Sequence, residues 1–280
     1  MKNQHNIPLF LICIISCDVP TERIINIDAP KFIQKSMPDS KVELGIDTEF
    51  RLKHGIQLMW YSNSKGEVDY YSIFRGNTSI DSTIEFKRIG DVFVNDPLKS
   101  DTLFHDTTAL THVDYYYFIK GVGHKGVEGK HSDTISYTMH DKPDAIAPAN
   151  TIQDSLPVFS WINNVTNFQY TSEFVLRVER IVTDSTDPVW TVHFYNEWFG
   201  FENYTPIYFQ FFPATSTWEE GNDTFHPNAP SNTISCFGLD TGLSPGSYRW
   251  KIKSISQMDN ESGIDLASGE SPWKYFSIQY

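Results

Sequence analysis

The sequence predicts an all-β protein made of two tandem β-sandwiches, and three features of the chain support this prediction. Thr, Ile, Val and aromatic residues alternate with polar residues in short runs, and Gly, Pro, Asn and Asp separate these runs. This is the pattern of strands and turns. After the N-terminal segment, no stretch has convincing helical periodicity. One segment of the chain occurs twice, and 280 residues are enough for two domains of ordinary size.

The repeat relates a segment near residue 110 to a segment near residue 243. Residues 109–120 align with residues 242–253, which matches Leu110 with Leu243, Tyr115 with Tyr248, Tyr117 with Trp250 and Ile119 with Ile252. In both copies a leucine precedes a tyrosine by five residues, and every second residue after the tyrosine is apolar. Each copy also has an upstream strand that ends in a tryptophan, at Trp60 or Trp161, and a downstream β-run at 134–139 or 273–278.

In these residues the chain resembles the fibronectin type III family, in which a core tryptophan lies on strand B and a tyrosine corner opens strand F. The run from Leu243 to Tyr248 is close to the usual motif of that family, whereas the first copy has His112-Val113 where Pro-Gly is common. Residues 61–75 look like the turn between strands B and C followed by strand C. The resemblance implies immunoglobulin-like sandwiches but no particular function, because such sandwiches host many unrelated roles.

The domain boundaries follow from the repeat and from composition. We expect a first sandwich at residues 41–140, a linker at 141–150 and a second sandwich at 151–280. Residues 17–40 contain three prolines and little patterning, so they are predicted to form a tether.

The second copy contains an aromatic-rich insertion at about 184–220. The spacing from tryptophan to tyrosine is 55 residues in the first copy and 87 in the second, and twelve aromatic residues lie between 190 and 218. In one interpretation these rings fill an extended sandwich. In the other, some rings face solvent and form a recognition surface, because flat rings stack on sugars and anchor protein interfaces. The candidate ligand-binding residues are Trp198 and Phe199, in a predicted loop tip, and Trp218.

The N-terminal residues are predicted to form an export signal. Residues 7–15 are apolar apart from Pro8, and a helix of this length rises only about 14 Å, too short to cross a bilayer. The run Ile14-Ile15-Ser16-Cys17 resembles a bacterial lipobox. The resemblance implies that residues 1–16 are a signal peptide and that Cys17 becomes a lipid-modified N-terminus. The alternatives are a plain secretory signal with a chance cysteine and a wrongly assigned start codon.

Composition argues against a nucleic-acid partner and against a disulfide within the chain. Without residues 1–16 the chain has 21 basic and 35 acidic residues, a net charge of −14, so no electrostatic argument favours nucleic-acid binding. Only Cys17 and Cys236 remain, and an acylated Cys17 cannot form a disulfide. Cys236 lies in an alternating run and is expected to be a small buried hydrophobe.

No enzyme motif accounts for the remaining polar residues. The chain lacks a phosphate-binding glycine loop, a Gly-x-Ser-x-Gly elbow and a His-Glu-x-x-His motif. His124, Glu128 and His131 could hold a metal, but a solvated hairpin loop is the favoured interpretation. The acidic runs at 183–187 and 221–224 could offer oxygen ligands to calcium but fit turns equally well. We therefore expect no catalytic residue, no metal and no cofactor.

These observations predict a non-catalytic binding or scaffold module that a lipid on Cys17 anchors in the bacterial envelope, in the periplasm or at the cell surface. Its partner would be an envelope protein or a glycan. Two alternatives remain open: a carbohydrate-binding module that uses the aromatic insertion, and an accessory subunit of an enzyme encoded elsewhere.

Overall fold

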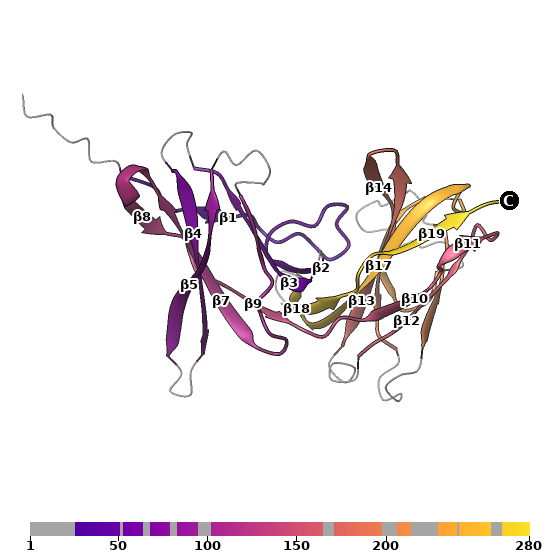
Figure 1. The fold of residues 1–280 in the computed structure, drawn as a ribbon. Helices are drawn as coiled ribbons and strands as arrows, with labels where there is room; N and C mark the ends of the chain where they lie inside the picture. The colour runs from indigo at the N-terminus through magenta and orange to yellow at the C-terminus, as the bar shows by residue number, and fades with distance from the viewer. Residues whose placement is uncertain are drawn as a thin grey trace, which may run out of the picture.

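The computed structural model describes most of the chain as β-structure. The described residues are 26–50, 53–63, 68–78, 83–94, 102–164, 171–197, 206–213, 229–239, 241–258 and 265–280. Within these ranges the structure has strands β1 to β19 and one short 3-10 turn, η1 (His124–Gly126). No helix in these ranges is long and apolar enough to cross a bilayer. The all-β prediction is confirmed, and the strands form two sandwiches that lie side by side (Figure 1).

The first sandwich packs two antiparallel sheets face to face. One sheet contains β1 (Lys31–Phe32), β2 (Asp47–Phe50), β3 (His54–Tyr61) and β6 (Leu103–Asp106), with β3 pairing with the other three. The other sheet contains β4 (Tyr70–Thr78), β5 (Ile84–Phe93), β7 (Asp114–Val122), β8 (Glu128–His131) and β9 (Ile135–Met139), in the order β5-β4-β7-β9, with β8 also paired to β7.

The second sandwich repeats this arrangement and adds an outer strand. Its smaller sheet has the order β10 (Asp144–Ala147), β12 (Val158–Ile162), β15 (Ile207–Gln210). In its larger sheet, β16 (Thr233–Gly238), β14 (Ser185–Tyr195), β13 (Glu173–Val182) and β17 (Gly246–Met258) are neighbours in that order. The long strand β17 then pairs with β18 (Asp265–Glu270) and β19 (Lys274–Ile278), and β11 (Asn150–Ile152) runs parallel to β19.

The predicted core tryptophans lie at equivalent places in the two sandwiches. Trp60 on β3 and Trp161 on β12 are both fully buried. Trp60 makes an edge contact with Tyr71 at 5.3 Å, and Trp161 makes one with Phe174, also at 5.3 Å. Alternation along each strand places these rings between the sheets because successive side chains of a strand point to opposite faces.

The two tyrosine corners differ in one respect from the sequence alignment. The Tyr248 hydroxyl donates to the carbonyl of Ser244 at 2.7 Å, and the backbone N–H of Leu110 donates to the Tyr115 hydroxyl at 3.2 Å. Leu243 is fully buried, but Leu110 is 65% exposed and Ala109 is buried instead. The match of Leu110 with Leu243 is therefore wrong for packing. The first corner lacks Pro-Gly and turns at His112, whose φ is 62°.

The sandwiches begin earlier in the chain than the expected boundaries. Ile27 is buried in the first core, and Phe32 on β1 pairs with Trp60, so residues 26–32 pack on the first sandwich where a tether was expected. Likewise, β10 lies inside the expected linker 141–150 and pairs with β12. Both strands are short, so their periodicity is too brief to be read from sequence.

The first edge strand of the first sandwich is interrupted by an excursion. The N–H of Ile33 donates to the carbonyl of Met59, whereas the N–H of Trp60 donates to Thr102 beside β6. Neighbouring residues of a strand form their backbone hydrogen bonds toward opposite edges, so Met59 bonds away from β6 and Trp60 bonds toward it. Strands β1 and β2 therefore both pair with the edge of β3 that is opposite to β6, one after the other. Residues 33–46, between β1 and β2, leave the sheet, and we call them the excursion.

The two sandwiches also share a sheet. Strand β9 of the first sandwich pairs in parallel with β18 of the second, with Thr138 opposite Ala267 and Met139 opposite Ser268. The larger sheets of the two sandwiches thereby join into one twelve-stranded sheet. The backbones approach closely at this point, since a Cβ on Gly269 would lie 2.1 Å from the carbonyl oxygen of Asp141.

Candidate functional site at the domain junction

The site residues that the sequence nominated lie outside the described residues. This holds for Cys17 and for the three aromatic candidates Trp198, Phe199 and Trp218. No geometry can be given for them, and they stay sequence-based predictions.

The described rings of the aromatic insertion divide into two groups. Five are buried in the second core: Trp190, Phe194, Phe209, Phe211 and Phe212. Two are exposed, Tyr195 at 55% and Tyr208 at 61%. In the core, Phe194 stacks on Phe209 with centroids 4.2 Å apart. These residues therefore fit the core-filling interpretation, with two rings left facing solvent.

The histidine turn has ordinary local contacts. Glu128 pairs with Lys120 at 2.9 Å, and His131 Nδ1 lies 2.6 Å from the carbonyl of Ser132. His124 Nδ1 lies 3.9 Å from a carboxylate oxygen of Asp69. Across the described part of the chain, no three His, Cys, Asp or Glu side chains group as metal ligands.

Cys236 lies on β16 and is half-buried against the second core. Burial raises the pKa of its thiol to about 12. At neutral pH the group is therefore a thiol with little thiolate character, as expected of a small buried hydrophobe.

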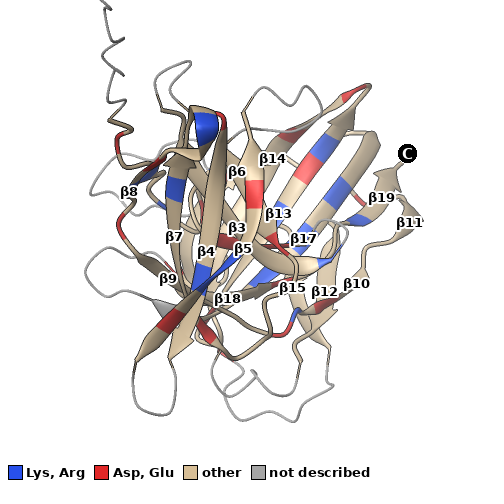
Figure 2. Cartoon of the chain, turned by 60° about the vertical axis from the view of Figure 1, so that its left-hand side comes forward, with Lys and Arg blue, Asp and Glu red and all other residues tan. Residues whose placement is uncertain are grey.

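A different site emerges on the outer face of the second sandwich. In β13 and β17 the apolar residues point into the core, and the residues between them point outward. Five neighbouring residues on this outer face are charged: Arg177, Glu179, Arg249, Lys251 and Lys253. Figure 2 shows these charges as bands across β13 and β17. Such a concentration of charge on one face needs counter-charges, and the first sandwich supplies them.

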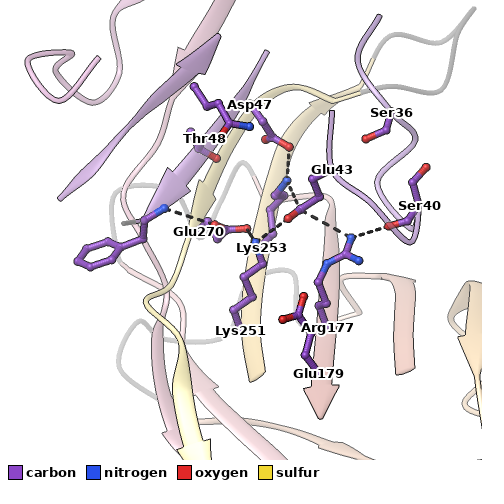
Figure 3. A network of polar contacts seen from close by, with 12 residues as sticks. Ser36, Ser40, Glu43, Asp47, Thr48, Arg177, Glu179, Lys251, Lys253 and Glu270 are labelled. Atoms are coloured by element: carbon purple, nitrogen blue, oxygen red, sulfur yellow. Dashed lines mark hydrogen bonds and ion pairs between the residues drawn. The ribbon is translucent and has the colours of Figure 1, made fainter. Parts of the chain in front are cut away.

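The excursion and β2 bring acidic groups onto this face (Figure 3). Glu43 lies 2.6 Å from Lys251 Nζ and 3.0 Å from Lys253 Nζ. Lys253 Nζ also lies 2.6 Å from Asp47 on β2. Arg177 donates to the carbonyl of Ser40 at 2.8 Å, which fixes the backbone of the excursion.

Other charged groups complete the set from both sandwiches. Lys35 Nζ lies 2.9 Å from Asp47 and 3.2 Å from Asp265 on β18. Glu270, also on β18, lies 2.6 Å from Lys251 Nζ. We call the resulting eight residues the junction cluster: Lys35, Glu43, Asp47, Arg177, Lys251, Lys253, Asp265 and Glu270.

The junction cluster is buried and electrically balanced. It contains four basic and four acidic groups, and every side chain except that of Glu43, at 21%, is at most 7% exposed. A hydroxyl network closes it, since Tyr137 Oη on β9 is within hydrogen-bond distance of Asp47, Asp265 and Ser268. Groups from the two sandwiches alternate through this network, so separating the sandwiches would break it.

The charges of the cluster set the pKa values of its members. Burial alone would raise the pKa of Glu43, but Lys251, Lys253 and Arg177 lower it well below its ordinary value. Burial would lower the pKa of Lys253, yet Asp47 and Glu43 raise it well above the usual range. Glu270 differs, because burial outweighs Lys251 and raises the pKa of that carboxyl to about 7.

A cleft opens beside the cluster, between the two sandwiches. It has a volume of about 410 Å³. Gln57, Met59 and Leu103 line it from the first sandwich, and Glu179, Arg249 and Trp273 line it from the second. Glu43 and Lys251 of the junction cluster are also exposed to it. Ligand sites occur preferentially at such domain interfaces.

Sequence reasoning missed this site, although one signal was present. Arg249, Lys251 and Lys253 alternate with Trp250 and Ile252, so three like charges share one face of one strand. Like charges on adjacent outward positions repel one another unless acidic groups lie close to them. The pattern therefore indicates a counter-charged partner but not where in the chain that partner lies.

Comparisons with known proteins add little to this description. No family model matches the sequence, and no curated protein is similar to it. Among solved structures, the crystal structure of the FN1–FN3 domains of chicken CNTN1 is similar, with 12% sequence identity and a TM-score of 0.26. The alignment covers 90% of this chain and 66% of that one, so the chain spans slightly under two thirds of that structure. The fold assignment rests on the strand order and packing described above.

Proposed function

We propose that this chain is an exported bacterial lipoprotein whose two sandwiches form one rigid, non-catalytic binding or scaffold module in the cell envelope. The observation that supports this proposal most directly is the junction cluster. A buried, balanced set of charges holds the sandwiches in one relative orientation, which suits a protein that presents surfaces at a fixed spacing.

The energetic argument for rigidity compares this junction with an ordinary one. Domains joined by a short linker usually share a small polar interface and move relative to each other. Here the interface includes a shared sheet and eight buried charges. Leaving one buried charge without its partner costs about 3–5 kcal/mol. Hinge opening that breaks several of these pairs is therefore strongly disfavoured.

The membrane anchor is proposed from the lipobox-like run that ends at Cys17. Stable attachment needs two or more hydrophobic chains, which lipoprotein processing of that cysteine would provide. The first described residue is Asn26, and the intervening residues span at most about 30 Å. An anchored Cys17 would thus hold the first sandwich close to the bilayer, in the periplasm or at the cell surface.

The anchor is tested by labelling cells that express the full chain with an alkyne fatty acid and then separating their membranes. The wild-type chain and the Cys236→Ala control should be labelled and found in the membrane fraction. The Cys17→Ala chain should be unlabelled and absent from that fraction. Equal labelling of Cys17→Ala would exclude the proposed anchor.

The rigid junction is tested with spin labels on exposed positions of the two sandwiches, at Lys87→Cys and Tyr275→Cys in a Cys236→Ala background. Pulsed electron paramagnetic resonance should give a single narrow distance distribution. A broad distribution would show that the sandwiches move independently and would remove the structural basis of this proposal.

The partner is proposed to be an envelope protein or a glycan. On sequence grounds, Trp198, Phe199 and Trp218 remain candidate contacts. A pull-down from native envelopes with the wild-type chain and with Trp198→Ala tests this. Recovery of the same partners by both chains would exclude Trp198 as a contact.

A further inference from the structure

The cleft between the sandwiches has the features of a small-ligand site. Its volume of about 410 Å³ falls within the usual range for ligand pockets. It is built entirely from described residues, and its two walls come from sandwiches that the junction cluster holds together. The inference below concerns what this cleft binds, and it rests on the proposed role as a binding module.

The ion pairs along the cleft make it a poor site for strongly charged ligands. The lining contains four basic groups, Lys41, Arg177, Arg249 and Lys251, and four acidic groups, Glu43, Asp47, Glu49 and Glu179. Most are paired within the protein, as Arg249 is with Glu179 at 2.8 Å and Lys251 is with Glu43 at 2.6 Å. A phosphate or a divalent cation would have to break such pairs to be neutralised. The cleft therefore suits a ligand without net charge.

Apolar groups are interspersed with these ion pairs. Met59 and Leu103 line one wall, and the half-buried ring of Trp273 lines the other. Arg249 and Lys251 hold that ring in place, with the guanidinium carbon 4.0 Å and the ammonium nitrogen 4.8 Å from its centroid. The cleft thus combines apolar surface with fixed polar groups, as a ligand with both C–H and hydroxyl faces requires.

The pair of Arg249 and Glu179 offers a donor and an acceptor side by side. Arg249 uses Nε and Nη2 to contact Glu179 Oε2, and Nη2 also donates to Thr186 at 3.0 Å. Among the described residues, Arg249 Nη1 and Glu179 Oε1 have no hydrogen-bond partner. The pair is held rigidly, so these two atoms keep a fixed spacing. Neighbouring hydroxyls of a sugar can accept from one and donate to the other.

We propose that the cleft binds a neutral saccharide, whose adjacent hydroxyls bridge the Arg249–Glu179 pair while its C–H groups lie against the apolar lining formed by Met59, Leu103 and Trp273. A zwitterionic amino acid fits less well, because it needs one unpaired cation and one unpaired anion, whereas Glu43, Glu179, Arg249 and Lys251 are already paired with one another. The site differs from the aromatic insertion, and none of its residues was nominated by the sequence.

The test is isothermal titration of the detergent-solubilised full chain with glucose, galactose, mannose, N-acetylglucosamine and their 1,4-linked disaccharides, at up to about 10 mM. At least one neutral sugar should bind. Arg249→Lys, which keeps the charge but loses the planar fork, and Trp273→Ala should each weaken binding about tenfold or more. Tyr275→Ala is the matched control, because this exposed ring lies two residues further along the chain but outside the cleft.

Thermal unfolding of each variant checks that it is folded. Failure of every sugar to bind the wild-type chain would overturn the inference, as would equal binding by wild type and both cleft variants. Binding of glycine or inorganic phosphate in place of sugars, with loss in Arg249→Lys, would overturn the saccharide assignment. If sugars fail while Cys17 is labelled and the spin-label distance is narrow, only this inference falls and the proposed function stands.

Discussion

The two sandwiches present chemically different surfaces at the same place in their folds. By the repeat alignment, Tyr116, Phe118 and Lys120 on β7 correspond to Arg249, Lys251 and Lys253 on β17. The neighbouring strands follow suit, since Phe74 lies opposite Phe118 and Arg177 lies opposite Lys251. Both sets point away from their cores.

In the first sandwich this outer face is aromatic. The ring of Phe118 stacks on Phe74 at 4.6 Å and lies 4.8 Å from Phe86 on β5. Lys120 extends over Phe74 and pairs with Glu128 in a half-exposed salt bridge. These rings and charges pair with one another within the first sandwich, so this face needs no groups from another part of the chain.

In the second sandwich the same face is charged and depends on the first sandwich for its counter-ions. Glu43 and Asp47 reach Lys251 and Lys253 from more than 200 residues away. Strand alternation therefore determines which side chains point outward. The chemistry of those side chains determines whether the face is stable against solvent or has to be covered by groups of opposite charge from another part of the chain. The predictions below test this distinction.

The largest effect is expected at the matched lysines. Lys253→Ala leaves Glu43 and Asp47 with less counter-charge in a buried place, so it should lower the free energy of unfolding by about 3–5 kcal/mol. Lys120→Ala, at the equivalent position, removes a partly exposed pair and should cost less than about 1 kcal/mol. Urea unfolding of both full-length variants measures the difference. Equal losses would mean that the two faces do not differ in their dependence on partners.

A glycine substitution tests the close approach at the shared sheet. Gly269→Ala places a methyl group against the carbonyl of Asp141, so the backbone must shift, at a cost of about 1–3 kcal/mol. The distance distribution between labels on Lys87→Cys and Tyr275→Cys should broaden or shift. Ser136→Ala, at an exposed position on β9, is the control and should leave the distribution unchanged. An unchanged distribution in Gly269→Ala would show that this contact does not set the domain orientation.

The pH dependence of stability tests the state of Glu270. The pKa of Glu270 in the folded chain, about 7, lies above its ordinary value, so the protonated form is favoured by folding. Its contribution is fully present at low pH and is lost as pH rises through about 7. Between pH 5 and 8 it should lower the unfolding free energy by roughly 1–3 kcal/mol.

His54, whose ring accepts from the Glu270 N–H, opposes this decline, because burial lowers its pKa to about 4 and its contribution to stability therefore increases as pH rises toward 6.5. Glu270→Gln should remove the Glu270 contribution alone, so between pH 5 and 8 the unfolding free energy of the variant should rise relative to that of the wild-type chain, as measured by urea unfolding at pH 5, 6, 7 and 8. The pKa values of Glu43 and Asp265 are lowered, so both stay ionised across this range and contribute no slope. The same dependence of the unfolding free energy on pH in Glu270→Gln and in the wild-type chain would show that Glu270 does not titrate in this range.

The smallest effect is expected on the aromatic face. Phe118→Ala removes stacking with Phe74 and Phe86 on a partly exposed surface, so it should cost about 1–2 kcal/mol. The distance between the two sandwiches should not change. A change would mean that the aromatic face also takes part in fixing the junction.

Much of each sandwich could be predicted from local pattern. Trp60 and Trp161 lie in the two cores, and Tyr115 and Tyr248 form corners, as alternation and the repeat indicated. Leu110 shows the limit of that reasoning. The first corner has His112-Val113 in place of Pro-Gly and turns at His112. The side chain that packs into the core before the tyrosine is therefore Ala109 and not Leu110.

The junction could not be predicted in the same way. Residues 33–46 have no clear strand periodicity, and they span the expected boundary at residue 41 between the tether and the first sandwich. Their importance comes from Glu43, and from Lys35 beside it, meeting charges on β17 and β18 that are distant in sequence. The cleft beside them depends equally on both sandwiches.

The all-β class, the repeat, the core tryptophans and the lipobox-like run at Cys17 can all be read from the sequence, because each depends on residues that are neighbours in the chain. Only the tertiary structure decided that Lys251 and Lys253 are buried against Glu43 and Asp47. Local alternation fixes the direction in which a side chain points. The partner it meets there depends on how the chain brings distant segments together, and a buried charge is stable only where that partner has the opposite sign.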